Sequence, residues 1–320
     1  MKKQFSVDFE ENVVINGSKQ NIRVRAEKEG LPVILFLHGG PGVCDRHVVM
    51  KYQSELAKDF TLVCWDQRGS GKSFYKGITN EKLSLDTYVE DAKALVDLLC
   101  EKFCVEKIIV AGHSWGTIVG IPLVSKYPEK IAAYVGQGQF VEGAQNEKLS
   151  YDFCLEEAKR RGDKKALSKL EGKAPVDGKY PDEKAMMAQR DCLSKYGGSN
   201  YKNRGGMIKS LLIPLIKSPE YKLSDIPKYA KGGLYLSKVL WDDAVEQNYF
   251  SVKNLDMPVI ITQGRHDFNT PSALAQKWFD SLEAPFKKWI WFEESAHSPI
   301  AEEPEKWTNE VRTALFEALA

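Results

Sequence analysis

Short apolar runs recur along two parts of this chain, residues 1–138 and 254–320. A run of this length, bounded by glycine or polar residues, is typical of a strand buried on both faces of a parallel sheet. An Asn16-Gly17-Ser18 turn also separates two of the segments, which predicts an opening hairpin. The strands predicted in this way are residues 13–15, 22–26, 33–37, 62–65, 108–112, 131–135, 259–262 and 288–292.

Amphipathic stretches between these strands predict helices. Residues 84–103 are the clearest case, because apolar residues recur on one helical face from Tyr88 to Leu99, and Ser84 or Thr87 can cap the helix. Strands that alternate with helices predict an α/β fold, with a mostly parallel sheet and helices on both of its faces. Two further helices are predicted over residues 271–282 and 303–319.

The pattern changes between residues 139 and 253. This stretch is rich in Lys, Glu, Asp, Ser and Gly, has helical periodicity and contains no convincing strand. We interpret residues 139–253 as a helical cap inserted into a core of residues 1–138 and 254–320. The cap should lie over the carboxyl ends of the strands, where an open α/β sheet holds its ligand. Its predicted helices are 146–161, 181–195, 206–217 and 232–245, and its glycine-rich stretches 197–200 and 205–206 are predicted to be mobile loops.

A Gly-x-Ser-x-Gly sequence joins one predicted strand to the helix after it. Gly112 and Gly116 flank Ser114, with apolar residues at 108–111 before them and at 118–121 after them. Strand, sharp turn and helix are the context that a nucleophile elbow requires. The serine backbone is strained in such a turn, and a side chain at either glycine would collide with the neighbouring strand or helix. We predict that Ser114 is a catalytic nucleophile.

A serine hydroxyl is a poor nucleophile unless a base removes its proton, and the chain has five histidines. His297 follows the last predicted strand, which is the place of the base in the chain order Ser, Asp, His of this elbow context. We therefore predict His297 as the base. His113 lies inside the elbow, and His38 opens a glycine loop where a structural hydrogen bond is expected. His47 is predicted on the surface, and His266 lies at a loop edge.

The acid that orients the base should follow the penultimate strand. Asp267 lies there and would hold the tautomer of the imidazole and stabilise the imidazolium. A role at a helix N-terminus is the alternative for Asp267, since Thr270 and Pro271 come next. Asp66 is the rival acid, but a buried structural ion pair with Arg68 explains it better.

The oxyanion of an acyl-transfer intermediate is stabilised by two backbone N–H groups. One should come from Trp115, directly after the nucleophile, and the other from the loop 38–42 that follows the strand 33–37. We predict Gly40 as the second donor, because glycine lets the backbone approach the substrate closely and Pro41 has no N–H. A simple tight turn is the alternative for this loop.

Composition narrows the class of protein. The formal net charge is +1, so neither nucleic acid nor an anionic membrane is an expected partner. The sequence contains no apolar run of roughly 18 residues, so no transmembrane helix is predicted. The N-terminus also lacks the apolar run of a signal peptide. The six cysteines form no C-x-x-C pair and are expected to be reduced thiols of a cytoplasmic protein. No residue cluster has the spacing of metal ligands, so no metal is expected.

Four motifs together resemble the prolyl aminopeptidase (proline iminopeptidase) branch of the α/β-hydrolase family. They are His38-Gly39-Gly40-Pro41-Gly42, Asp66-Gln67-Arg68-Gly69-x-Gly71-x-Ser73, Gly112-His113-Ser114-Trp115-Gly116 and Gly264-Arg265-His266-Asp267. The resemblance implies the α/β-hydrolase fold, the triad of Ser114, Asp267 and His297, and release of an N-terminal residue, often proline, from short peptides. No cofactor is implied.

The cap resembles this family less than the core does. Family members bind the substrate ammonium with cap carboxylates, which makes Glu246 the candidate here, beside Gly39 as a second substrate-binding residue. A solvated acid at a helix end is the alternative for Glu246. With 21 Lys and Arg against 16 Asp and Glu, the cap has a net charge of +5, which weakens the case for a cationic substrate. The remaining alternatives are an esterase, lactonase or amidase on a small acyl substrate and, in another class, a non-catalytic ligand-binding member of the fold.

Overall fold

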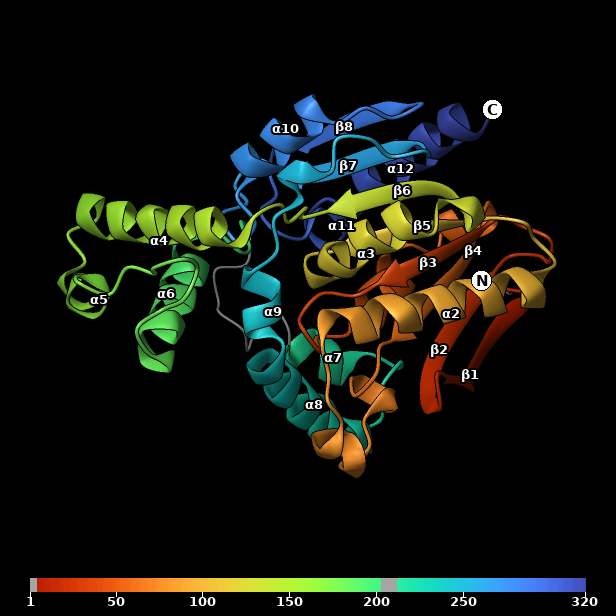
Figure 1. Ribbon diagram of the computed structural model, residues 1–320, viewed down its shortest axis with the longest axis horizontal. Coiled ribbons are helices and arrows are strands. Elements are labelled where there is room, and N and C mark those ends of the chain that lie inside the picture. Colours follow the sequence, from red (N-terminus) through yellow and green to blue (C-terminus); the bar gives the residue numbers. More distant parts are fainter. Residues whose placement is uncertain (1–4, 203–211) are drawn as a thin grey trace.

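One eight-stranded sheet forms the centre of the computed structural model, which describes residues 5–202 and 212–320 (Figure 1). Its strands are β1 (Val7–Ile15), β2 (Ser18–Ala26), β3 (Val33–Leu37), β4 (Thr61–Asp66), β5 (Ile108–His113), β6 (Ile131–Gln137), β7 (Val259–Gly264) and β8 (Lys287–Phe292). The order across the sheet is β1-β2-β4-β3-β5-β6-β7-β8. β2 pairs antiparallel with β1 and with β4, and all other neighbours are parallel. The predicted mostly parallel sheet is confirmed.

Every predicted strand is present, but the opening hairpin is longer than predicted. Its turn uses Asn16 and Gly17 at φ of 45° and 75°, as a two-residue type I′ turn requires. β1 is the edge strand, and its side chains alternate between exposed and partly buried positions. Residues 7–12 therefore lack the continuous apolar run by which a strand in the middle of the sheet is recognised.

Helices cover both faces of the sheet. These core helices are α1 (Arg46–Tyr52), α2 (Leu85–Phe103), α3 (Trp115–Lys126), α10 (Ser272–Ser281), α11 (Pro299–Glu302) and α12 (Pro304–Leu319). Val33, Leu35 and Leu37 of β3 pack on the face covered by α2, α3 and α10, whereas Ile34 and Phe36 pack on the face covered by α1 and α12. Because successive strand side chains point to opposite faces, each wholly apolar strand contributes to two apolar cores.

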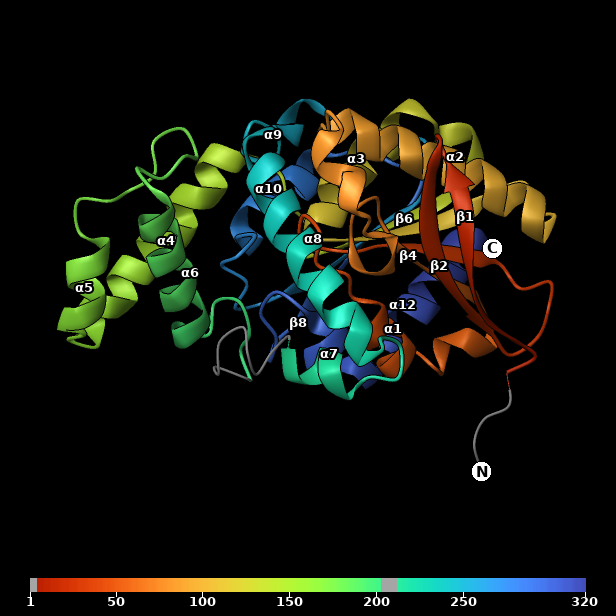
Figure 2. The ribbon, with the colours of Figure 1, turned by 90° about the horizontal axis from the view of Figure 1, so that it is seen from below.

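The insert between β6 and β7 is helical. Its helices are α4 (Gly143–Arg160), α5 (Lys164–Leu170), α6 (Glu183–Tyr196), α7 (Ile213–Lys217), α8 (Ile226–Val239) and α9 (Trp241–Val245). α4, α5 and α6 form a lobe that projects away from the sheet, at the left of both views, while α7, α8 and α9 lie beside the core (Figure 1, Figure 2). The lobe has its own small apolar core around Tyr151, Cys154 and Leu193. We keep the name cap for residues 139–253, which contain α4 to α9.

Two details of the cap differ from the prediction. The helix predicted over residues 232–245 is broken at Leu240 into α8 and α9. α5 was missed because only Ala166 and Leu170 of its side chains are buried, which is too few for a periodic signal. The helix predicted over 206–217 includes α7, but residues 206–211 and the glycine pair 205–206 lie outside the described residues.

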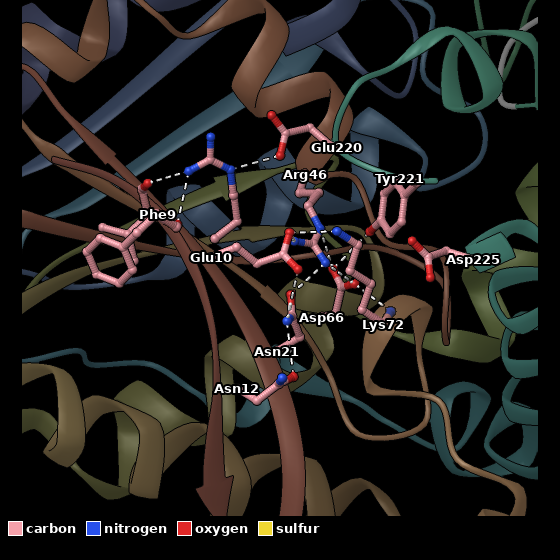
Figure 3. Close-up of polar contacts among 12 residues, drawn as sticks. Phe9, Glu10, Asn12, Asn21, Arg46, Asp66, Lys72, Glu220, Tyr221 and Asp225 are labelled. Carbon is pink, nitrogen blue, oxygen red and sulfur yellow. Dashed lines mark hydrogen bonds and ion pairs between the residues drawn. The ribbon is translucent and has the colours of Figure 1, made fainter. Parts of the chain in front are cut away.

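A buried network of charged side chains connects the hairpin, a core loop and the cap (Figure 3). The guanidinium of Arg46 donates two hydrogen bonds to Asp66, at 3.1 and 2.6 Å, and the Tyr221 hydroxyl donates a third at 2.9 Å. Although burial alone would raise it, the neighbouring Arg46 holds the pKa of Asp66 below its ordinary value. The predicted partner of Asp66 is wrong, because Arg68 lies in the turn beyond β4 and pairs with Asp91 of α2 at 2.7 Å.

The cysteines and the helices give three further observations. All six cysteines are free thiols, of which Cys104 is exposed and the other five are buried. Within residues 5–202 and 212–320, no helix is long and apolar enough to cross a membrane. The same residues contain no group of three His, Cys, Asp or Glu side chains placed to hold a metal ion.

Candidate active site

The elbow lies between β5 and α3, at the carboxyl edge of the sheet. Ser114 has a φ of 52° and a ψ of −115°, a conformation that few non-glycine residues adopt. Two backbone hydrogen bonds hold it there, from Ser114 N–H to Gln137 O at 3.1 Å and from Thr117 N–H to Ser114 O at 2.7 Å. A Cβ on Gly116 would come within 1.9 Å of Leu37 O, so the close approach of α3 to β3 requires glycine.

Asp267 and His297 are joined directly. His297 Nδ1 lies 2.9 Å from Asp267 Oδ2, and both side chains are buried. Four further groups donate to the same carboxylate, namely Gln263 Nε2, Thr270 Oγ1 and the backbone N–H groups of Asn269 and Thr270, at 2.9 to 3.0 Å. These bonds fix the carboxylate in one orientation, so it can hold the imidazole in a single tautomer.

Ser114 and His297 border one cavity of about 610 Å³. In the part of the chain that the structure describes, no hydrogen bond joins Ser114 Oγ to His297 Nε2, although both residues border this cavity. Hydrogen bonds between nucleophile and base are often long without substrate and shorten when it binds. The structure thus brings the three predicted triad residues to one place, from three different loops.

The other histidines near Ser114 hold the backbone. His38 Nε2 accepts the Gln67 N–H at 3.1 Å, so Nδ1 carries the proton and donates to Gly39 O at 2.7 Å. Burial lowers the pKa of His38. His113 Nε2 lies 3.1 Å from the carbonyl oxygen of His297. His113 therefore supports the loop that carries His297.

The glycine loop after β3 lies against the elbow. A Cβ on Gly39 would lie 3.5 Å from Ser114 Cβ and 3.3 Å from His113 Nδ1, so only glycine lets the loop come this close without a shift. Gly40 has a φ of 129° and borders both cavities beside Ser114. The Trp115 indole N–H donates to Gln67 Oε1 at 2.9 Å, which fixes the start of α3.

Ser114 lies between two cavities of different size. The small cavity has a volume of about 140 Å³ and is bordered by Gly40, Ser114, Trp115 and Glu147. The large cavity is bordered by Gly40, Ser114 and His297. A substrate whose reacting carbonyl sits at Ser114 can therefore extend into both.

Comparison with known proteins identifies the family. A family model described as the alpha/beta hydrolase fold matches residues 32–183. The probable aminopeptidase YbaC of Bacillus subtilis is 30% identical over 308 residues, which cover 95% of each chain. The chain belongs to the α/β-hydrolase family, in its proline iminopeptidase-like branch.

Other relatives agree with this α/β-hydrolase assignment. A proline iminopeptidase of Heyndrickxia coagulans is 25% identical over 305 residues, which cover 92% of this chain and 93% of the relative. The crystal structure of a proline iminopeptidase from Mycobacterium smegmatis has a TM-score of 0.64 and 16% identity, covering 97% of this chain and 98% of that one. A proline iminopeptidase-related protein from Thermus thermophilus has a TM-score of 0.67 and 18% identity, covering 98% and 99%. The two solved structures show a shared fold.

The structure does not bring Glu246 to the site of this α/β-hydrolase. Glu246 follows the last residue of α9, is 64% exposed, and pairs with Lys179 at 3.0 Å. It borders neither cavity. The prediction of Glu246 as a substrate-binding residue is therefore corrected, and a solvated acid at a helix end describes it.

A different cap carboxylate borders the small cavity. Glu147 of α4 is 4% exposed, accepts a hydrogen bond from Arg190 Nη2 at 2.7 Å, and lies 3.3 Å from Asn146 Nδ2. We missed Glu147 in the sequence, although it falls within the predicted helix 146–161 on the same face as the buried Tyr151 and Cys154. An acid on the apolar face of an amphipathic helix was the signal that could have found it.

His47 also differs from the prediction. It was expected on the surface, but its side chain is buried and borders the large cavity. Burial lowers the pKa of His47 to about 4. His47 is buried because a distant part of the chain covers α1. This part is α7 of the cap with Tyr221 after it, and the ring of Tyr221 packs against that of His47. That contact cannot be read from residues near His47.

The glycine-rich stretch 197–200 was predicted to be mobile, but the structure anchors it on the loops that carry Asp267 and His297. Gly198 O accepts the N–H of Phe268 at 2.9 Å, and Ser199 O accepts the N–H of His297 at 3.3 Å. A Cβ on Gly198 would lie 2.5 Å from Leu193 Cδ1, so close packing accounts for a glycine at this position. We call residues 198–202 the strap, since they connect α6 of the cap to the loops of Asp267 and His297.

Glu302 holds the other end of the strap. One oxygen of its carboxylate accepts the Ala296 N–H at 2.9 Å, and the other accepts the N–H groups of Tyr201 and Lys202 at 2.7 and 3.1 Å. Burial raises the pKa of Glu302, and these backbone hydrogen bonds oppose the rise. The cap and the His297 loop are thus joined through one buried carboxylate.

Proposed function

We propose that this α/β-hydrolase is a serine hydrolase in which Ser114 attacks the substrate carbonyl. His297 removes the hydroxyl proton and later gives a proton to the leaving group, while Asp267 orients His297 and stabilises the imidazolium. Water then releases the acyl group from Ser114. The observation that carries the proposal is the 2.9 Å contact of His297 Nδ1 with Asp267 Oδ2 at a cavity that Ser114 also borders.

We propose that the backbone N–H groups of Gly40 and Trp115 bind the oxyanion. Both residues border the small cavity beside Ser114. Gly39 supports this role, because its missing side chain lets the loop lie against the elbow. Removal of one such donor typically destabilises the transition state by about 3–4 kcal/mol.

We propose that the substrate is a short peptide from which an N-terminal residue, proline or a similar small residue, is released. The small cavity can hold one such residue as the acyl group, and Glu147 is the candidate for binding its ammonium. The pairing of Glu147 supports this, because one of its oxygens receives the 2.7 Å bond from Arg190 and the other has a longer contact, 3.3 Å, with Asn146. The relatives named aminopeptidase and proline iminopeptidase support the same substrate class.

Hydrolysis of a small ester, lactone or amide is the second candidate. Arg190 favours it, because its guanidinium borders the small cavity and neutralises Glu147 there. An acyl group without an ammonium would suit a cavity with no net charge. A non-catalytic binding protein is the third alternative, which the arrangement of Ser114, His297 and Asp267 argues against. Six free thiols support the cytoplasm as the location.

One set of assays tests these alternatives. Proline and alanine arylamides are compared with p-nitrophenyl esters, and a fluorophosphonate probe reports a reactive serine. We expect wild-type enzyme to cleave the arylamides and to be labelled, whereas Ser114→Ala should lose about 10⁶-fold in kcat and all labelling while keeping its circular dichroism spectrum. Cleavage of esters without arylamides would refute the aminopeptidase proposal. Undiminished turnover by Ser114→Ala would refute the serine mechanism.

A further inference from the structure

The main chain around the proposed base is held by hydrogen bonds from three separate parts of the protein. The N–H of Ala296, directly before His297, donates to the carboxylate of Glu302 at 2.9 Å. The N–H of His297 donates to Ser199 O in the strap at 3.3 Å, and its carbonyl oxygen lies 3.1 Å from His113 Nε2. These contacts fix the main chain of His297 in addition to its imidazole ring.

Glu302 contributes to two of these three contacts. It is the last residue of α11, the short helix that begins two residues after His297, and its side chain reaches back to the loop before His297. One carboxylate oxygen binds the N–H of Ala296 directly. The other accepts the N–H groups of the last two residues of the strap, in which the carbonyl of Ser199 binds the N–H of His297. Glu302 therefore acts on the base from two sides.

The carboxylate of Glu302 is buried and has backbone partners. Within residues 5–202 and 212–320 it forms no ion pair, because Lys202 Nζ binds the backbone oxygen of Glu302 and pairs with Glu294 instead. Burial of a carboxylate without a cation is unfavourable, so the three N–H groups must compensate for the lost water. Both oxygens belong to one planar group, which holds the loop of His297 and the strap at a fixed separation.

We propose that Glu302 is a positioning residue for His297, an inference that rests on the proposed serine mechanism. A general base must lie within hydrogen-bond reach of the proton that it removes, and a displacement of about 1 Å can lower the rate about 100-fold. By holding the loop and the strap together, Glu302 sets the place of the imidazole relative to Ser114. The strap continues from α6 and borders the large cavity at Ser199, so the same carboxylate ties the base to the cap.

Glu303, the next residue, provides a matched comparison. One of its oxygens accepts the Glu294 N–H at 3.0 Å and the Ser295 hydroxyl at 2.6 Å. Glu303 therefore anchors the same loop, but neither of these bonds involves the strap. A purely structural role for Glu302 predicts similar effects when either acid is lost. A positioning role predicts that loss of Glu302 alone lowers the rate of the chemical step.

Glu302→Gln and Glu303→Gln are compared for kcat, KM and the rate of labelling by the fluorophosphonate probe. A side-chain amide has one acceptor oxygen and one donor nitrogen, so Glu302→Gln leaves either the loop or the strap facing a donor. We expect its kcat and labelling rate to fall about 10–100-fold, with KM and the circular dichroism spectrum unchanged. Glu303→Gln should keep kcat within about three-fold of wild type. Glu302→Asp keeps the charge but is one methylene shorter, and its kcat should lie between those of wild type and Glu302→Gln.

The outcomes separate the positioning role from the proposed function. Equal losses of kcat in Glu302→Gln and Glu303→Gln, or wild-type kcat in Glu302→Gln, would overturn the positioning role. Should Glu302→Gln fail to fold, wild-type kcat in Glu302→Asp would overturn it. Absence of labelling in the wild-type enzyme would refute the serine mechanism instead. The position of His297 is then followed by the NMR resonance of the proton between His297 Nδ1 and Asp267, and an unchanged chemical shift in both Glu302 variants overturns the positioning role there as well.

Discussion

Two arginine–carboxylate pairs of similar geometry have different surroundings in the core and in the cap. Arg46 binds Asp66 through Nε at 3.1 Å and Nη2 at 2.6 Å, and Arg160 of α4 binds Glu157 through the same two nitrogens at 2.8 and 2.7 Å. Both core side chains are 1% exposed, whereas Arg160 is 65% exposed. Exposed pairs contribute little to stability, while removing one partner of a buried pair leaves an uncompensated charge. Burial, more than contact geometry, decides which charges matter here.

The same difference in burial distinguishes the triad candidates Asp267 and His297 from most charged residues of the cap. Asp267 and His297 are buried and pair with each other at the carboxyl edge of the sheet. Many cap charges form exposed pairs, such as Lys179 with Glu246. Glu147 with Arg190 is a cap pair whose carboxylate is buried, and it borders the small cavity. A charge in the cap should therefore affect catalysis where it is buried.

The largest effect is expected for the buried carboxylate beside the base. Asp267→Asn keeps the size of the side chain but removes the charge that holds His297 in one tautomer. We expect kcat to fall about 10⁴-fold, as in other triads, measured with the substrate that wild-type enzyme cleaves fastest. Asp280→Asn, the same change at an exposed position of α10, should leave kcat unchanged. Equal activity of the two variants would remove Asp267 from the triad.

The next effect sharpens the comparison of the two arginine pairs. Arg46→Met leaves Asp66 buried without its cation, so the free energy of unfolding should fall by about 3–5 kcal/mol. Arg160→Met, the same substitution in the cap, should change it by less than about 0.5 kcal/mol. Urea denaturation followed by circular dichroism measures both values. Similar losses for the two variants would show that exposure does not distinguish these pairs.

A smaller effect is expected within the cap. Glu147→Gln removes the charge proposed to bind the substrate ammonium and should lower kcat/KM about 10–100-fold for substrates with a free α-amino group. An analogue without a free α-amino group, either the N-acetylated substrate or an ester of an acid that has no amine, should be cleaved by Glu147→Gln at the wild-type rate. Glu246→Gln is the matched control and should behave as wild type on both. Equal losses on both substrate types in Glu147→Gln would indicate a structural role for Glu147.

The fold and the three triad candidates could be predicted because their signals are local. An apolar strand before Gly112 and an apolar helix after it identify the elbow, and Asp267 and His297 each follow a predicted strand. Parallel strands bring their carboxyl ends to one edge of the sheet. Chain order and strand positions therefore suffice to expect these side chains close together.

The remaining site residues depend on contacts between distant segments. Asp66 pairs with Arg46, at the start of a helix earlier in the chain, rather than with its near neighbour Arg68. His47 is buried beside Tyr221 of the cap. Glu147 differs from these two residues, because its place on the apolar face of α4 could have identified it. For Asp66 and His47, burial by a distant element leaves no trace in the residues next to them.

The strap has a consequence for protein engineering. Gly198 and Ser199 supply backbone acceptors to the loops of Asp267 and His297, and Glu302 binds the N–H groups at the other end of the strap. A chimera that receives a foreign cap would lose those acceptors and leave the N–H groups of Phe268 and His297 unpaired. A chimera of two relatives should therefore retain residues 198–202 of the protein that receives the cap. The new helices are then joined on either side of these residues.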